Sequence, residues 1–301
     1  MTRLSEYKWF LCLLRRSLGI GGNGLYPWME DIPLPELTHS QWEFIYSTAV
    51  RQGVVGIMYG AVQDLPVPAD IAQRWLMATM AIEQSWAAHH ETVERQRRAW
   101  AANGIDAVLL KGLESAGLYP HPELRACGDI DWWIRGEEDW DKAIGLLETG
   151  GIEWEEDSDG DLHYNLDGIV VEHHRKGLLS EGPEGVLLML CDHVLHHAMV
   201  AGVGMKHVCD YIMALRFYEG RYDKDSYQAL LDGTGLAKWE RTLLRMPDTL
   251  LRMILGDGNF GLDKKWRFSG MLTKWIFFMH VCPTVMIRRW WGLILGRVKR
   301  K

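Results

Sequence analysis

The stretch Val108-Leu-Leu-Lys-Gly112 is followed farther along by Gly128-Asp-Ile-Asp-Trp-Trp-Ile134. The second stretch is typical of a buried strand. Successive strand side chains point to opposite faces, so Asp129 and Asp131 share one face. Two carboxylates held together repel each other, and a divalent cation relieves that repulsion. Carboxylate oxygens suit Mg²⁺ and Mn²⁺, which usually take one or two carboxylates together with phosphates. The pair therefore predicts a metal site that handles a phosphate-bearing substrate.

The residues around this pair alternate between short strands and helices. Asp167-Gly168 lies between two β-rich runs, which is a strong hairpin signal. A pair of prolines at 120 and 122 ends the helix before them. We predict strands at residues 105–110, 129–134, 162–166 and 169–173. We predict helices at residues 113–119 and 137–149.

Helical patterns dominate on both sides of this mixed segment. Before it, Ser40 and Glu43 resemble a capping box, and residues 69–103 predict one long helix. After it, residues 185–199 and 206–218 are the clearest helices. The predicted fold class is α+β, with a small mixed β-sheet nucleotide-handling core flanked by helical regions. Its three regions are 1–104, N-terminal helical; 105–178, the α/β core; and 179–301, C-terminal helical with a basic tail.

Composition is that of a globular protein, with 48% apolar and 24% charged residues. The five cysteines are scattered and form no Cys-x-x-Cys pair, which argues against a disulfide framework or a zinc ribbon. The apolar run at residues 9–14 is too short to span a membrane and is not a signal peptide. We therefore expect a cytoplasmic protein.

The C-terminal segment is strongly basic. Between Lys264 and Lys301 there are ten Lys or Arg and no Asp or Glu, whereas the whole chain carries a net charge of −7. Residues 274–301 mix these cations with Trp and Phe. Such a segment can lie on an anionic membrane, bind nucleic acid, or pack on the acidic body of its own chain.

A third carboxylate, Glu172, lies in the otherwise apolar run 169–173. If that strand pairs with the strand of Asp129 and Asp131, three carboxylates converge. They could then hold two divalent ions for in-line displacement at phosphorus. The alternatives are solvated acids on an exposed strand edge for the Asp pair and a salt bridge for Glu172. Lys111 could contact phosphate or form an ion pair with one of the Asp residues.

The arrangement of these motifs resembles an uncharacterised bacterial nucleotidyltransferase family of the polymerase-beta-type superfamily. The residues that carry the resemblance are Leu110-Lys-Gly112, Leu118-Tyr-Pro120, Arg125, Asp129-Ile-Asp131, Glu172 with His174, the helical pair His193 and His197, and Asp210. The resemblance covers residues 105–215.

The resemblance implies a role for each motif. Asp129 and Asp131 would be metal ligands shared with the nucleotide, and Glu172 would be the third ligand and the base for the acceptor. Lys111-Gly112 replaces the Gly-Gly or Gly-Ser of the superfamily and would face phosphate, with Arg125 as a clamp. The implied reaction is Mg²⁺- or Mn²⁺-dependent transfer of an NMP from an NTP to an unidentified acceptor. That acceptor could be a small molecule, a protein or RNA.

His193 and His197 are four residues apart, so they lie on one face of a helix. That spacing can bind zinc, but no Glu follows the first His as in zinc proteases, and no third ligand is evident. We expect this face to pack on the α/β core. There the histidines would contact the nucleotide or be hydrogen-bonded core residues.

Two other kinds of function remain open from the sequence. The unusual Lys111-Gly112 turn is compatible with a non-catalytic, regulatory nucleotide-binding module. Residues 274–301 are compatible with an interaction protein that binds a membrane surface or nucleic acid peripherally.

Overall fold

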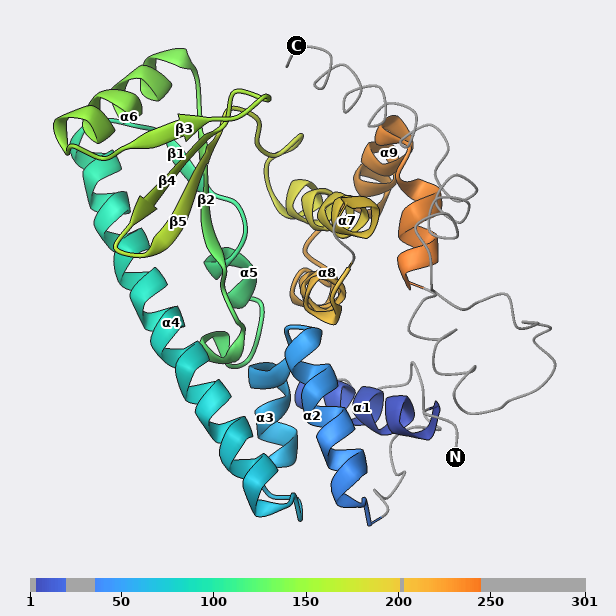
Figure 1. Cartoon of the computed structure of the whole chain (residues 1–301). Helices are drawn as coiled ribbons and strands as arrows, with labels where there is room; N and C mark the ends of the chain where they lie inside the picture. Colours follow the sequence, from blue (N-terminus) through green and yellow to red (C-terminus); the bar gives the residue numbers. More distant parts are fainter. Residues whose placement is uncertain (1–3, 20–35, 201–202, 245–301) are drawn as a thin grey trace, which may run out of the picture. The chain divides into compact units, whose positions relative to one another are not determined.

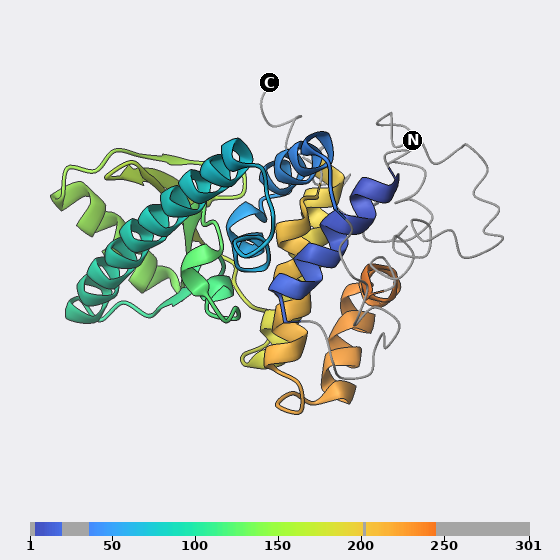
Figure 2. The same cartoon turned by 90° about the horizontal axis from the view of Figure 1, so that it is seen from below.

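The computed structural model describes residues 4–19, 36–200 and 203–244. Figures 1 and 2 show the elements from two directions. The chain divides into two compact units, and the helix α1 (Leu4–Ser17) crosses the division. Of the described residues, one unit contains 14–19 and 38–178, and the other contains 4–13, 36–37, 179–200 and 203–244.

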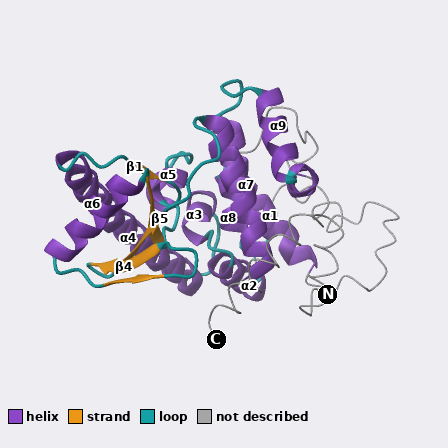
Figure 3. Cartoon of the chain, turned by 90° about the horizontal axis from the view of Figure 1, so that it is seen from above, coloured by secondary structure: helices purple, strands orange, loops and turns teal. Residues whose placement is uncertain are grey.

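A five-stranded sheet forms the centre of the first unit, and Figure 3 shows its strands in orange. The strand order is β1 (Ala107–Leu109), β2 (Asp129–Ile134), β5 (Ile169–His174), β4 (Leu162–Leu166) and β3 (Trp154–Glu156). Strands β2 and β5 pair in parallel, and the other neighbours pair antiparallel. The small mixed sheet predicted from the sequence is therefore present, with β3 as an additional edge strand.

Two helices supply the apolar side chains that pack on one face of this sheet: α4 (Ala69–Ala102) and α6 (Glu137–Thr149) (Figure 1). The shared core includes Trp100 of α4, Trp140 of α6 and Trp132 of β2. Along β5 the buried residues alternate with more exposed ones. The alternation means that one face of the sheet is apolar, and the opposite face can carry charged side chains.

Several element boundaries differ from the sequence prediction. Strand β1 is shorter than 105–110, and α5 (Leu113–Ala116) ends early, before a 3₁₀ turn at Pro122–Leu124. The hairpin turn is as predicted, with positive φ at Asp167 and Gly168.

The predicted cap of helix α2 (His39–Arg51) was wrong by two residues. Thr38 is the N-cap, and the side chain of Gln41 accepts a hydrogen bond from the Thr38 N–H at 2.9 Å. A capping box accepts Gln as well as Glu at this position. Glu43 instead pairs with Arg74 at 2.7 Å.

The remaining helices are α3 (Val55–Val62) in the first unit and three in the second. Those three are α7 (Pro183–Val200), α8 (Met205–Phe217) and α9 (Lys224–Thr234), and residues 237–244 are also helical. The Trp239 indole donates to the Cys191 carbonyl at 3.1 Å, which fixes this last helix against α7. Within the described ranges, no helix has the length and apolar character needed to cross a membrane. The basic segment 274–301 lies outside the described residues.

Candidate active site

The parallel pairing of β2 and β5 brings the predicted carboxylates to one face of the sheet. Asp131 lies directly opposite Glu172, and Asp129 lies opposite Val170. Residues two apart on one strand share a face, so Asp129, Asp131 and Glu172 all project from the face opposite the apolar core. The sequence made this convergence conditional on the two strands being neighbours, and the structure shows that they are.

Asp131 is the most buried of the three acids, with no exposed surface. Its Oδ1 atom lies 2.8 Å from the Lys111 ammonium and 2.9 Å from the Nε2 atom of His174. Burial raises the pKa of Asp131, but the hydrogen bond with His174 and the charge of Lys111 lower it to about 2. The carboxylate is therefore ionised at neutral pH and held between two cations.

His174 is the centre of a short chain of charged contacts. Its Nε2 atom meets Asp131, and its Nδ1 atom meets Asp161 at 2.8 Å. Burial lowers the pKa of His174, but these two carboxylates raise it to about 9. The imidazolium therefore donates from both nitrogens. The Arg175 backbone N–H donates to Asp161 at 2.9 Å, which fixes the outer carboxylate.

Glu172 has a different environment from its neighbour. It is half-buried, and its Oε1 atom lies 3.2 Å from the Nδ1 atom of His163 on β4. Burial and the nearby charge of Asp131 both raise the pKa of Glu172. Of the two paired carboxylates, Glu172 is therefore the better proton acceptor in the absence of a metal.

The charged residues form a row across the sheet. The strand register places Glu155, His163, Glu172 and Asp131 side by side on β3, β4, β5 and β2. His163 lies between two acids, and such opposite-charge neighbours stabilise a sheet when the histidine is protonated. Glu172 and Asp131 are like-charged neighbours, which is unfavourable unless a cation lies between them.

The oxygen atoms of this face suit a divalent cation. The Oδ2 atom of Asp131 is buried and has no hydrogen-bond partner among the described residues. Asp131, Glu172 and His174 each offer one ligand atom, and these atoms lie within 4.8 Å of one another. Carboxylate oxygens fit Mg²⁺ and Mn²⁺. Asp129 lies on the same face but outside this close group. His174 belongs to the group, but as an imidazolium that donates to Asp131 it has no lone pair for a metal and instead orients that carboxylate.

The predicted phosphate-side residues lie at the end of β1. Gly112 has φ of +64°, and a Cβ there would lie 2.9 Å from the Asp129 carbonyl oxygen. Glycine is therefore required for the chain to turn this close to β2. The Lys111 ammonium points to Asp131, which is the ion pair considered from the sequence. Arg125 is 4% exposed and donates to the Ala126 carbonyl at 3.2 Å, which places it in the protein interior.

His193 and His197 lie on α7, in the second unit, together with His207 of α8. Their predicted contact with a nucleotide stays a prediction. From the sequence we predicted no role for His207 or Asp161 and did not predict that His163 contacts Glu172. Asp161 follows a turn with no recognisable motif, and the pairing of His163 with Glu172 depends on strand register.

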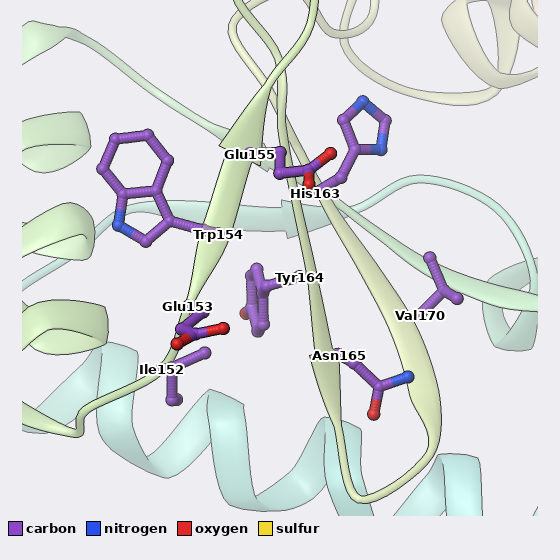
Figure 4. A pocket seen from close by; sticks show the side chains of 8 residues that line it. All are labelled: Ile152, Glu153, Trp154, Glu155, His163, Tyr164, Asn165 and Val170. Atoms are coloured by element: carbon purple, nitrogen blue, oxygen red, sulfur yellow. The ribbon is translucent and has the colours of Figure 1, made fainter.

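An open hollow of about 720 Å³ lies over β3 and β4 (Figure 4), and its lining does not include Asp129, Asp131 or Glu172. Its lining includes Trp154, His163, Asn165 and Val170. His163 belongs both to this hollow and to the charged row, because it contacts Glu172. His163 is therefore the link between the hollow and the charged face of the sheet.

Comparison with known families supports a nucleotidyltransferase domain. Residues 38–185 match the model of a family described as an uncharacterised nucleotidyltransferase. This range contains the whole sheet, Lys111 and the three carboxylates. Comparison with curated proteins found no match, and comparison with solved structures found none.

Proposed function

We propose that the chain is a Mg²⁺- or Mn²⁺-dependent nucleotidyltransferase that moves an NMP from an NTP to an acceptor and releases pyrophosphate. The observation that carries this proposal is the pairing of Asp131 with Glu172 on adjacent parallel strands, within the range that matches the family model. Asp129 completes the acidic face two residues earlier. The scattered cysteines favour a cytoplasmic setting.

Asp129, Asp131 and Glu172 would hold the metal, with His174 beside them. A bound divalent ion would offset the charge of the triphosphate and lower the pKa of the acceptor hydroxyl. Lys111 pairs with Asp131 in the absence of a metal. When a metal ion binds that carboxylate, the Lys111 ammonium would turn to a phosphate oxygen. Gly112 has no side chain, so a phosphate could approach the backbone at the same edge of the sheet. Arg125 is buried, so it would bind a phosphate only after a movement of its loop that exposes the guanidinium.

In the proposed reaction the acceptor hydroxyl oxygen attacks the α-phosphorus of the NTP. The bond between that phosphorus and the oxygen bridging to the β-phosphate breaks, and pyrophosphate leaves. Glu172 would take the hydroxyl proton, because it lies beside Asp131 on the face where the acceptor would meet the phosphate. His174 orients Asp131 by donating to its Oδ1 atom.

The proposal is tested by incubating the full chain with α-labelled NTPs, Mg²⁺ and a fractionated cell extract as the source of acceptors. We expect label transfer to a protein, RNA or small-molecule fraction. Asp131→Asn and Glu172→Gln should each abolish transfer, whereas Glu148→Gln, an exposed acid on α6, should not. Transfer that survives in both site variants would contradict the assignment.

A second candidate is a non-catalytic nucleotide-binding module. The observation that favours it is that Lys111 and His174 already neutralise Asp131 without a metal. This candidate predicts NTP binding that is independent of Mg²⁺ and insensitive to Asp131→Asn, with no label transfer. Equilibrium dialysis of labelled NTP with and without Mg²⁺ separates the two candidates.

A further inference from the structure

Three histidines lie together in the second unit. In the chain they follow the residues of the proposed active site, which all belong to the first unit. His193 and His197 lie one turn apart on α7, and His207 lies near the start of α8. The two helices pack against each other. The sequence showed the first two histidines but no third ligand, because His207 is brought to them only by this packing.

The three rings are in mutual contact. The ring centroids of His193 and His197 are 4.5 Å apart, those of His193 and His207 are 5.3 Å apart, and those of His197 and His207 are 4.0 Å apart. One nitrogen from each ring lies within 4.8 Å of the others. All three side chains are half-buried, so a small ligand can still reach them.

The helices hold this cluster in place through buried apolar neighbours. Val194 and Leu195 on α7 and Val208 on α8 are at most 1% exposed. These residues flank the histidines in the chain and anchor both helices in the core. The three imidazoles are therefore placed by the fold and not by flexible loops.

Three imidazoles in contact cannot all be protonated without strong repulsion. A neutral imidazole has one nitrogen that can bind a metal ion, and one nitrogen of each of these rings lies within 4.8 Å of the others. Imidazole nitrogen suits Zn²⁺, Ni²⁺ and Cu²⁺, whereas Mg²⁺ requires oxygen ligands. The cluster is thus chemically distinct from the carboxylates of the sheet.

We propose that His193, His197 and His207 form a binding site for one divalent transition-metal ion, with Zn²⁺ as the best fit. Zinc sits about 2.0–2.1 Å from each histidine nitrogen, so two ligand nitrogens are about 3.4 Å apart. Ring rotation that shortens the nitrogen–nitrogen spacing from within 4.8 Å to about 3.4 Å would bring all three nitrogens to one ion. Three protein ligands leave a fourth position for water or another ligand.

A buried carboxylate stands close in sequence to one of these ligands. Asp210 is 2% exposed and follows His207 by three residues on α8, which places it on the same side of the helix. Histidines that bind metals usually donate their second N–H to a carboxylate or a carbonyl. Asp210 is therefore the candidate for orienting His207.

The test uses the full chain, stripped with a chelator and kept in excess Mg²⁺, which competes with zinc for the carboxylate site. Zn²⁺ is then titrated in competition with a chromophoric chelator. We expect one equivalent of Zn²⁺ to bind. His207→Gln and His193→Gln should each weaken binding by at least about tenfold. The matched control is His196→Gln, an exposed histidine on the same helix, which should bind like the unmodified chain.

Two further measurements separate this site from the sheet. Asp131→Asn with Glu172→Gln should keep the zinc equivalent, and zinc should raise the thermal midpoint of the unmodified chain but not of His207→Gln. Co²⁺ bound to the unmodified chain should show the visible absorption of a four-coordinate ion. Absence of zinc binding in excess Mg²⁺ would overturn the proposal. So would equal affinity in the unmodified chain and the histidine variants, or loss only in the carboxylate variant.

Discussion

The ion pair between Asp131 and His174 makes the stability of the metal-free protein depend on pH. Burial and the partner charges together leave the pKa of Asp131 at about 2 and that of His174 at about 9. Against ordinary values of 3.8 and 6.5, these shifts correspond to about 2 and about 3 kcal/mol. Both shifts report largely the same contact, so they are not added. We take about 2–3 kcal/mol for the pair.

The sign of the effect follows from the direction of each shift. The pKa of His174 is raised, so its stabilisation is complete below about pH 6.5 and is lost as the pH rises through about 9. The pKa of Asp131 is lowered, so its stabilisation is present above 3.8 and is lost as the pH falls through about 2. Between about pH 6 and about pH 10 the contact should therefore lose about 2–3 kcal/mol of unfolding free energy.

Urea unfolding followed by tryptophan fluorescence measures this loss, with a chelator present because a divalent ion would compete for Asp131. The perturbation is Asp131→Asn, which keeps the shape and removes the charge. We expect the variant to lose at least half of the pH-dependent difference, with Asp161 retaining the remainder. Asp167→Asn, an exposed acid on the hairpin, is the control. Equal pH dependence in the variant and the unmodified chain would refute the reasoning.

Three further predictions concern stability. Tyr164→Phe should lower the unfolding free energy by about 1–3 kcal/mol in urea titrations, because it leaves the buried Gln96 amide and His173 imidazole without their shared partner. Gly112→Ala should lower it by about 1–3 kcal/mol, because φ of +64° and the close Asp129 carbonyl oppose a side chain, whereas Gly145→Ala on α6 should not destabilise. Glu43→Ala should change it by less than about 1 kcal/mol, because the pair with Arg74 is solvent-exposed.

The parts of the fold that the sequence predicted are those specified by local patterns. Strand β2 and helix α6 have the predicted bounds, because a run of apolar residues and an acidic first turn are readable in a short window. Strand β3 was missed because it is a short edge strand whose residues Glu155 and Glu156 are exposed. Its position depends on pairing with β4, which no local pattern records.

The site shows the same division between local and non-local information. Asp129 and Asp131 were found because their spacing on one strand is meaningful by itself. The roles of His163 and Asp161 depend on strand register and on a loop conformation, and the third member of the histidine cluster depends on helix packing. Contacts between residues far apart in the chain were therefore the ones that only the structure could supply.

The two faces of β5 explain how a small sheet can hold so many charges. On the core face, Gln96 accepts from the Trp132 indole, so its amide donates to Tyr164. The Tyr164 hydroxyl then donates to His173, whose pKa is lowered to about 3 by burial and by the neighbouring cation His174. His173 is therefore neutral, and the described chain of Gln96, Tyr164 and His173 on the core face carries no charge. The charged side chains of the site therefore lie on the face where a substrate or metal can bind. The neutral hydrogen bonds on the core face hold the strands together.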